Sequence, residues 1–453
     1  MTDNSPSPAI SPEPAMEKEK NMRKVALIAL GGSSIEWYDF FIYSTAAALV
    51  FPTLFFPPDI SPRTALILSF LTIAVGFIAR PIGGIVFGHF GDRVGRKAAL
   101  VTALMIMGVG STLIGLIPTY ATIGAAAPIL LTVLRFVQGF AIGGQWGGAM
   151  LLVTENAPNN KRGFYGAFAQ AGAPVGVILA NLAFLLVSAT VSDEFFMSWG
   201  WRIPFISSIL LIGMSLYVQL NLEDTAAFKQ LAKTSQDKKD NAQSNEPAPR
   251  SPVLEAIRLY PKRIALAAGA FLSIQVTFYI LIGFVIAYAG DSAGLGLPRN
   301  TMLAAICIGS ILQIPAQFWA ASYSDRHGRR GIFMIGAILT GIWAFFLFPL
   351  IDTGNFFLIT VGVTGGLTFL GFMYGPQAAF FTELFTTRVR YSGATLGYQL
   401  GAIVGGALAP TIAVLLWDRY GIFYVSVYIA FASLLTLISI KLLSETFTTD
   451  LND

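Results

Sequence analysis

Four charged side chains stand deep inside apolar stretches of this 453-residue chain. Two are carboxylates, Glu36 and Asp39, in the first apolar stretch. Two are guanidinium groups, Arg80 and Arg135, each many residues from the ends of its own stretch. A charge inside hydrocarbon costs about 2.5–3.5 kcal/mol on insertion scales, so each should face a cavity or a partner. These side chains are the first candidates for proton and anion chemistry.

The two carboxylates have a spacing that places them on one helix face with a tyrosine. Glu36, Asp39 and Tyr43 follow one another at intervals of three and four residues. Such a face can form one wall of a wet pathway, where a carboxyl group can bind and release protons near neutral pH. We therefore expect Asp39 and Glu36 to handle protons or a ligand. The alternative is a static buried ion pair.

The two arginines suit carboxylate recognition, because a guanidinium presents its N–H donors in a planar fork. Arg80 and Arg135 can each pair with Asp39 or bind a carboxylate substrate. The alternative role is a salt bridge that holds the first half of the protein together.

Further candidates for ligand binding lie among the glycines 139, 143 and 147, whose spacing of four predicts a smooth stripe for close helix contact. Gln145 and Trp146 bring polar and aromatic groups to that stripe. The second half has no acid deep in an apolar stretch. Its polar candidates suit hydrogen bonds to a hydroxylated or zwitterionic solute, although each alone can equally join helices: Gln275, Thr277, Tyr279, Gln313, Gln317, Tyr374, Gln377, Tyr398 and Gln399. The predicted substrate-binding residues are Arg80, Tyr43, Gln138, Gln145, Trp146, Gln275, Tyr279, Tyr374 and Gln377.

These residues would be positioned by twelve apolar helices. The chain is 55% hydrophobic with a mean hydropathy of +0.66, and its charged fraction of 12% compares with about 25% in soluble domains. Most apolar stretches exceed the roughly 20 residues that a helix needs to cross a bilayer. The sequence therefore predicts an all-α membrane protein with spans at 25–51, 64–87, 98–117, 123–153, 164–187, 203–220, 264–288, 301–322, 332–351, 356–381, 392–417 and 422–443.

The distribution of Lys and Arg predicts the orientation. The even-numbered loops and both termini hold 23 of the 29 basic residues, whereas the odd-numbered loops hold four. Basic residues concentrate on the cytoplasmic side of membrane proteins, so both termini are expected in the cytoplasm of a cell-membrane protein. This spread of basic residues also accounts for the sequence pI near 9.0 without nucleic-acid binding.

Two matched pairs of loops predict an internal repeat. Asp-Arg-x-Gly-Arg occurs at 92–96 and at 325–329, six helices apart, and a Glu precedes an Arg by seven residues at 155–162 and at 383–390. Repeated six-helix halves can rock about a central site. We expect these loops to act as gates, with simple positive-inside anchoring as the alternative. The predicted gating residues are Asp92, Arg93, Gly95, Arg96, Glu155, Arg162, Asp325, Arg326, Arg329, Glu383 and Arg390.

The predicted domain organisation follows from the repeat. Residues 1–24 are polar and are expected to be disordered. A first bundle at 25–220 and a second at 263–443 are separated by a polar cytoplasmic linker at 221–262, with room for a short surface helix, and a cytoplasmic tail follows at 444–453. A single cysteine, Cys307, rules out an internal disulfide.

The repeated Asp-Arg-x-Gly-Arg loop, the run Arg135-x-x-Gln138-Gly139 and the twelve helices resemble the major facilitator superfamily. Within it, the segments 36–40, 79–84, 198–205 and 390–393 resemble the metabolite:proton symporters, which include carriers for shikimate, 2-oxoglutarate, citrate, and proline or betaine. This resemblance implies proton-driven uptake with Asp39 and Arg135 in the coupling region. The chain departs from these carriers at Gln145, where they commonly have Glu.

The predicted function is proton-coupled import of a small polar metabolite, an organic acid such as shikimate or a dicarboxylate, by alternating access. The alternatives are a proton-coupled exporter of metabolites or drugs, and a membrane sensor without transport. The linker is too short for the added cytoplasmic domain that a sensor would carry. An enzyme is not expected, because no Ser/His/Asp set, nucleotide loop or metal cluster appears. We expect a monomer in the lipid bilayer that requires no cofactor and binds no nucleic acid.

Overall fold

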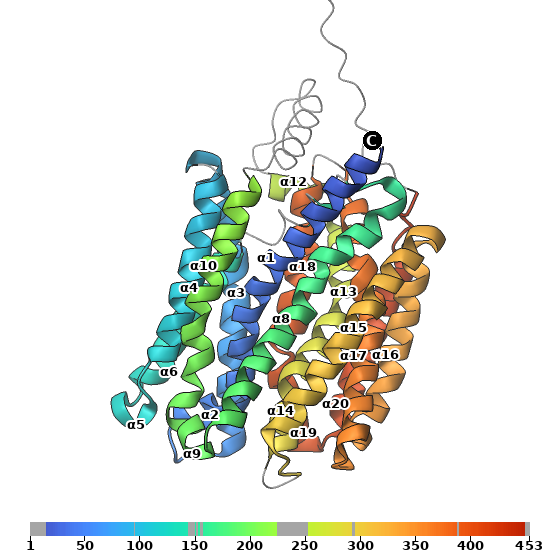
Figure 1. Cartoon of the computed structure of the whole chain (residues 1–453). Helices are drawn as coiled ribbons and strands as arrows, with labels where there is room; N and C mark the ends of the chain where they lie inside the picture. Colours follow the sequence, from blue (N-terminus) through green and yellow to red (C-terminus); the bar gives the residue numbers. More distant parts are fainter. Residues whose placement is uncertain are drawn as a thin grey trace, which may run out of the picture.

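The computed structural model contains helices and no strands in the part of the chain that it describes (Figure 1). That part comprises residues 15–94, 96–143, 150, 153–154, 157–223, 252–291, 295–386 and 389–448. One side of the bundle carries the start of α1 and the end of the last helix, α20. We call it the termini side, and the opposite side the far side.

The membrane spans follow the predicted order. In the first half they are α1 (Ala15–Leu49), α3 (Pro62–Val94), α4 (Arg96–Leu116), α6 (Ala126–Ile142), α8 (Arg162–Thr190) and α10 (Arg202–Glu223). In the second half they are α13–η3–α14 (Pro261–Tyr279, Ile280–Phe284, Val285–Gly290), α15 (Arg299–His327), α16 (Arg329–Asp352), α17 (Phe356–Glu383), α18–η4–α19 (Arg390–Gly401, Ala402–Ala407, Ala409–Tyr420) and α20 (Phe423–Leu442).

Short elements join these spans. They are α2 (Phe51–Leu54), α5 (Tyr120–Ile123), η1 (Asn159–Lys161), α9 (Asp193–Phe195), η2 (Phe196–Gly200) and α12 (Pro252–Leu259). Within the described residues, nine helical segments are long and apolar enough to cross a membrane. α4, α6 and α10 complete the twelve predicted spans.

Two expectations are corrected by the helix boundaries. Residues 15–24 were predicted to be disordered but form the first turns of α1. This stretch is rich in Met, Glu, Lys and Arg, which have high helix propensity, so the membrane helix continues beyond the apolar run. The seventh and eleventh spans are not single α-helices, because the π-helical segments η3 and η4 interrupt them.

The internal repeat is visible in how glycines join equivalent helices. A Cβ added at Gly176 of α8 would lie 2.6 Å from the Trp37 Cβ of α1. A Cβ at Gly405 of η4 would lie 3.0 Å from the Gln275 Cβ of α13. The fifth span therefore packs on the first as the eleventh packs on the seventh, which is the relation expected between two copies of one six-helix unit.

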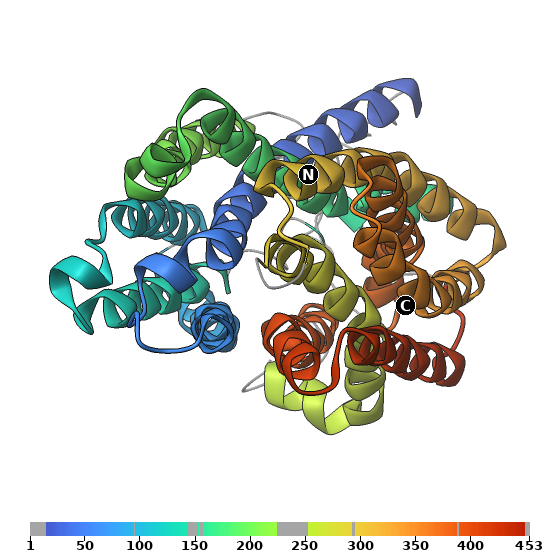
Figure 2. The same ribbon diagram turned by 90° about the horizontal axis from the view of Figure 1, so that it is seen from below.

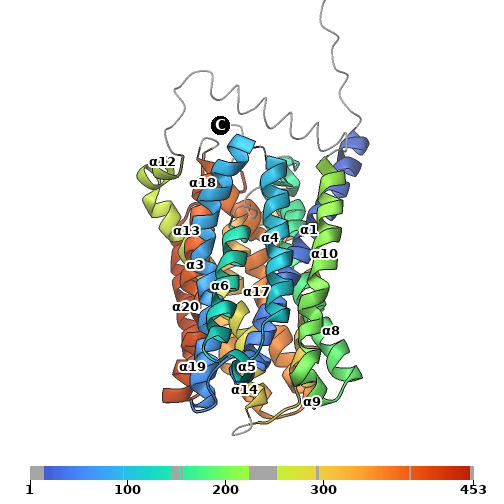
Figure 3. The same cartoon turned by 90° about the vertical axis from the view of Figure 1, so that its left-hand side faces the viewer.

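Glycines also set the spacing of the helices that carry the two buried arginines. α3 and α6 lie side by side in the first half, followed by α4 and α10 (Figure 3). A Cβ at Gly139 of α6 would collide with the backbone of Gly76 on α3, and a Cβ at Gly143 would collide with the backbone at Arg80. Close backbone contact through small residues is the usual means of helix association in membranes. Gly139 and Gly143 therefore pack as their spacing predicts, while Gly147 lies outside the described residues.

Replacing Gly139 with Ala should destabilise the protein by about 1–3 kcal/mol, because the added methyl group forces α3 and α6 apart. The measurement is thermal unfolding of the purified protein in detergent, followed by size-exclusion chromatography. Gly213→Ala is the matched control, since a Cβ there meets nothing within 4 Å. Equal stability of the two variants would contradict the close packing of α3 on α6.

The two halves meet along two seams, seen from the far side in Figure 2. Along the first seam, α8 and α15 are joined over their whole length, from Arg299 and Ser188 on the far side to Asp325 and Gly163 on the termini side. Along the second seam, α3 packs against η4 and α19, and α1 packs against η3 and α14. The contacts of the second seam lie in the middle and on the far side, so the structure is closed on the far side.

Candidate functional site

Arg80 and Arg135 come together at the centre of the first half, around one aromatic ring. The guanidinium carbon of Arg80 lies 4.7 Å from the ring centre of Phe40 and 4.1 Å from that of Phe77. The guanidinium carbon of Arg135 lies 4.2 Å from the Phe40 ring centre and 4.1 Å from that of Tyr43. Such cation–π contacts stabilise desolvated cations. Phe40 of α1 thus holds an arginine from α3 and another from α6.

Neither guanidinium group forms an ion pair with a carboxylate of the described residues. Among the described residues, no Asp or Glu oxygen lies within 4.0 Å of Arg80 or Arg135, although both are at most 2% exposed. The Nε and Nη2 atoms of each also lack a hydrogen-bond partner within that part of the chain. Within the described residues, these arginines therefore form neither the salt bridge considered for the first half nor a direct pair with Asp39.

Asp39 lies beside the arginine pair and is linked to it through Gln138. Gln138 Nε2 donates to Asp39 Oδ2 at 3.4 Å, and Gln138 Oε1 accepts from Arg135 Nη1 at 3.4 Å. Gln138 Nε2 also lies 2.5 Å from Ser111 Oγ, which fixes the amide against α4. The carboxyl group is 2% exposed, and its Oδ1 atom has no hydrogen-bond partner in the described residues. One amide thus connects a buried acid to a buried cation.

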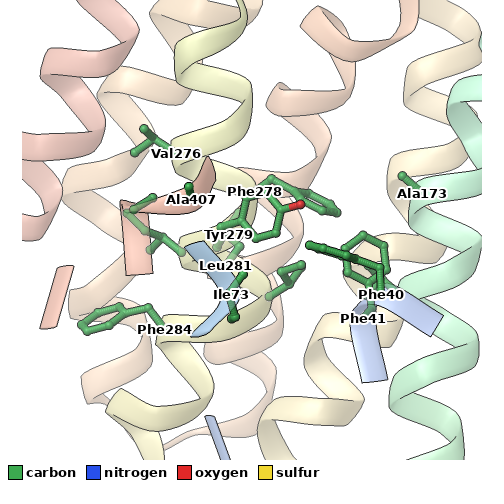
Figure 4. Close-up of a cluster of buried hydrophobic side chains, with 14 of the residues drawn as sticks. Phe40, Phe41, Ile73, Ala173, Val276, Phe278, Tyr279, Leu281, Phe284 and Ala407 are labelled. Carbon is green, nitrogen blue, oxygen red and sulfur yellow. The ribbon is translucent and has the colours of Figure 1, made fainter. Parts of the chain in front are cut away.

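The second half faces this cluster with aromatic side chains. Figure 4 shows Phe40 and Phe41 of α1 opposite Phe278 and Tyr279 of α13. The ring centres of Phe40 and Tyr279 are 6.0 Å apart, and those of Phe77 and Tyr279 are 5.3 Å apart. Tyr279 and Tyr398 are within electrostatic reach of Arg80, and Tyr374 is within reach of both tyrosines. The phenols of one half therefore meet the guanidinium groups of the other.

The predicted substrate-binding residues are only partly brought together. Tyr43, Arg80, Gln138, Tyr279 and Tyr374 gather around the Phe40 ring or its neighbours. Tyr43 donates to Thr72 Oγ1 at 2.5 Å. Two more predicted residues have other contacts. Gln377 accepts from Gln170 Nε2 at 2.9 Å, and Gln275 packs against Gly405 and Gly406. Gln145 and Trp146 lie outside the described residues.

Glu36 differs from Asp39 in its surroundings. It is partly exposed, whereas Asp39 is buried, so only Asp39 combines deep burial with proximity to the arginines. Phe40, Phe77 and Ser111 were not predicted, and Tyr398 was named only in the wider polar set. An aromatic or a serine in an apolar helix is too common to stand out. The one available signal was the position of Phe40 directly after Asp39.

On the termini side, the second Asp-Arg-x-Gly-Arg loop forms a buried network of charges. Asp325 accepts from the backbone N–H groups of Gly163 and Phe164 at 2.7 and 2.9 Å, which caps the start of α8 across the seam. Arg329 binds Asp325 at 2.6 Å and binds both oxygens of Glu383 at 2.9 and 3.2 Å. The loop therefore ties α15 and α17 of the second half to α8 of the first half.

The tail contributes a carboxylate that was not predicted. Glu445 accepts from the backbone N–H groups of Arg329 and Arg330 at 2.8 and 3.0 Å, and so caps the start of α16. Thr446 donates to Glu383 at 2.8 Å. The position of Glu445 shortly after α20 gave no sign of its contacts with the start of α16, because they depend on how α20 packs against α16.

The other predicted gating residues are placed as follows. Arg162 donates to Asn159 at 2.7 Å, Arg390 donates to the Phe385 carbonyl at 3.3 Å, and Arg326 is exposed. Gly95 and Glu155, and the side chains of Asp92, Arg93 and Arg96, lie outside the described residues.

The chemistry available at the site is binding of an anion and transfer of a proton. The described residues include no group of three or more His, Cys, Asp or Glu side chains that could hold a metal ion. Two buried guanidinium groups with free donors can hold a carboxylate. A nearby carboxyl group can carry a proton, and phenols on the opposite half can donate hydrogen bonds.

Comparison with known proteins places the chain in a family. Residues 24–453 match the family model described as "Sugar (and other) transporter". The chain is 43% identical over 429 residues to the inner membrane metabolite transport protein YhjE of Escherichia coli, covering 93% of this chain and 94% of that protein. It is 40% identical over 402 residues to the shikimate transporter of E. coli, covering 86% and 87%.

A solved structure shows the same fold. The inward open conformation of the xylose transporter XylE from E. coli matches with a TM-score of 0.71 at 17% sequence identity, covering 95% of this chain and 98% of that one. The predicted twelve-helix fold and the resemblance to the major facilitator superfamily are confirmed, as is the expectation that the protein is not an enzyme. The chain belongs to the sugar (and other) transporter family of the major facilitator superfamily and is a multi-pass membrane transporter.

Proposed function

We propose that the protein is a proton-coupled symporter that imports a small organic anion by alternating access. One observation carries this proposal: Arg80 and Arg135 are buried together, with no carboxylate oxygen of the described residues within 4.0 Å of either. Buried charges are usually paired. A substrate carboxylate would supply the missing partner, and the planar guanidinium fork suits it.

The charges of the site suggest why a proton and an anion would travel together. With Asp39 ionised, one negative and two positive charges share the site. Protonation of Asp39 leaves both guanidinium groups without a nearby counter-charge from the described part of the chain, which favours anion binding. Loss of the proton returns a competing negative charge, which acts on Arg135 through Gln138. Binding and release of the anion would then follow binding and release of the proton.

The second half would recognise the rest of the substrate. Tyr279 and Tyr398 are within electrostatic reach of Arg80, and Tyr374 is within reach of both tyrosines. A phenol can donate to or accept from a hydroxyl group. A site shared between two halves is what alternating access requires. One relative is named as a shikimate transporter, and shikimate is a hydroxylated carboxylate, which supports this substrate class. We propose a monomer with both termini in the cytoplasm, since the basic residues concentrate on the termini side.

The termini-side network would act as a gate within this cycle. Asp325 binds α8 across the seam, so its contacts must change if the halves separate on that side. Replacing Asp325 with Ala should lower uptake about tenfold or more while the protein still binds substrate. The reason is that the state closed on the termini side loses a charged helix cap. The measurement is uptake into proteoliposomes beside equilibrium binding in detergent. Arg326→Ala, at an exposed side chain in the same loop, is the matched control. Normal uptake by the Asp325 variant would leave anchoring as the role of this loop.

The proposed function is tested by uptake into proteoliposomes with an imposed inward proton gradient, with and without a protonophore. The panel contains the anions shikimate, 2-oxoglutarate and citrate, and the zwitterions proline and betaine. We expect protonophore-sensitive accumulation of an anion and none of a zwitterion. Accumulation of a zwitterion alone would contradict the anion site. Efflux driven by the opposite gradient, without uptake, would favour an exporter.

A further inference from the structure

On the far side, one arginine holds two carboxylates of the opposite half. Arg63, in the first turn of α3, lies 2.7 Å from Asp418 and 3.7 Å from Asp291, measured between nitrogen and oxygen atoms. Its guanidinium carbon also lies 4.3 Å from the ring centre of Trp417. Arg63 therefore makes three contacts with the second half, all of them across the seam between α3 and the seventh and eleventh spans.

The two carboxylates stand at the ends of comparable segments. Asp418 is in the last turn of α19, and Asp291 directly follows α14. α19 follows η4 after Leu408, and α14 follows η3 directly. A π-helical segment breaks the regular hydrogen-bond ladder of a helix and is often found where helices bend or function. Arg63 thus contacts both spans beyond the points at which their α-helices are interrupted.

The ends of the seventh and eleventh spans meet through Trp417 of α19, which contacts η3 and α14, and we call α14 and α19 together the far-side lid. The ring centres of Tyr288 and Trp417 are 5.2 Å apart, and those of Phe284 and Trp417 are 5.8 Å apart. Between the lid and the centre of the bundle, η4 contacts the end of α13 at Tyr279, whose ring packs on Phe77 beside Arg80. Movement of the lid would therefore change access to the Arg80 and Arg135 site from the far side.

We propose that Arg63 is the latch of this lid. In the far-side-closed state, Arg63 binds Asp418 and Asp291 together and holds α14 and α19 against the first half. When both pairs break, the lid bends at η3 and η4 and opens the central site to the far side. This role requires alternating access but neither the identity of the substrate nor proton coupling, so it goes beyond the proposed function.

The strength of the contacts suits a latch that opens in every cycle. The side chains of Arg63, Asp418 and Asp291 are 36%, 49% and 22% exposed. Exposed ion pairs are weak and are screened by salt. Neutralising Arg63 should therefore raise the ratio of far-side-open to far-side-closed protein about two- to tenfold, rather than prevent folding.

The other seam supplies a matched control. Arg299, in the first turn of α15, pairs with Asp193 and donates to Ser188 of the first half at 2.8 Å. This is also a far-side ion pair between the halves. However, α15 and α8 are uninterrupted by π-helical segments, and they stay in contact to the termini side. Arg299 therefore joins two halves without holding the lid.

The experiment measures the opening of the lid directly. Spin labels are attached to Thr53→Cys and Tyr420→Cys, both exposed, in a Cys307→Ala background. Double electron–electron resonance then gives the distance distribution between α2 of the first half and α19. We compare the otherwise unchanged protein with Arg63→Gln, with Asp418→Asn as a second way to break the latch, and with Arg299→Gln.

We expect Arg63→Gln and Asp418→Asn to increase the long-distance population about two- to tenfold, and Arg299→Gln to leave it unchanged. Raising the salt from about 0.1 M to about 1 M shortens the Debye length from about 10 Å to about 3 Å. It should therefore move the unmodified latch toward the Arg63→Gln distribution and have little effect on that variant. An unchanged distribution in both latch variants would overturn the proposal. An equal shift in Arg299→Gln would also overturn it, because the whole half would then move as a rigid body.

Discussion

Asp39→Asn should abolish accumulation of the substrate against a gradient and leave only equilibration across the membrane. Asparagine has the shape of aspartate and can still contact Gln138, but it cannot take up and release a proton. In the proposed cycle the halves would still alternate, so exchange of labelled for unlabelled substrate should continue. The measurement is uptake into proteoliposomes with an inward proton gradient, beside counterflow without a gradient.

Glu36→Gln is the matched control for this prediction. It makes the same chemical change on the same helix face, three residues away, at a side chain that is partly exposed and not linked to Arg135 through Gln138. We expect it to retain part of the concentrative uptake. Full accumulation by the Asp39 variant would show that Asp39 does not couple protons to transport. The contact of Asp39 with Gln138, and through it the link to Arg135, would then have a structural role.

Arg135→Lys should lower uptake at low substrate concentration about tenfold or more, mainly through a higher KM. The guanidinium lies over the rings of Phe40 and Tyr43 and reaches Gln138. A lysine keeps the charge but is a compact point charge without the planar fork, so it can neither stack in the same way nor hold a carboxylate at two points. The measurement is the concentration dependence of initial uptake rates.

Arg202→Lys separates recognition from stability. Arg202 is also buried in the first half, but its Nη1 atom donates to the carbonyl groups of Gly115 and Ile117 at 2.7 and 2.8 Å. Its replacement should lower thermal stability and leave KM close to normal. If Arg135→Lys instead transports with a normal KM, the role of Arg135 is electrostatic and the two-point recognition is wrong.

Arg80 and Phe40 illustrate a relation that sequence spacing could not predict. The cost of burying a guanidinium group singled out Arg80 and Arg135 as functional, whatever their neighbours. That both lie against one ring, and that neither reaches Asp39, depends on the separation of α1, α3 and α6. This separation is set by collisions that glycines avoid, such as Gly139 against Gly76, and such contacts have no signature in either helix alone.

The sequence by itself determined the properties that depend on short stretches of chain. Twelve apolar segments of sufficient length must become helices in a bilayer, because every backbone polar group there needs an internal partner. The repeated loops indicated two related halves, and the buried charges indicated the region of the site. The helix boundaries were less accurate where polar helix-forming residues extend a span, as they do in α1.

Only the tertiary structure decided which distant residues meet. Asp325 caps α8 from the opposite half, Glu445 of the tail caps α16, and Arg63 binds the ends of two spans more than two hundred residues away. The π-helical segments η3 and η4 also depend on the tertiary structure, because they arise where one helix adapts its hydrogen bonds to its neighbours. The reason is physical: helix formation in a membrane is a local energy balance, whereas ion pairs, caps and ring contacts depend on how whole helices are placed.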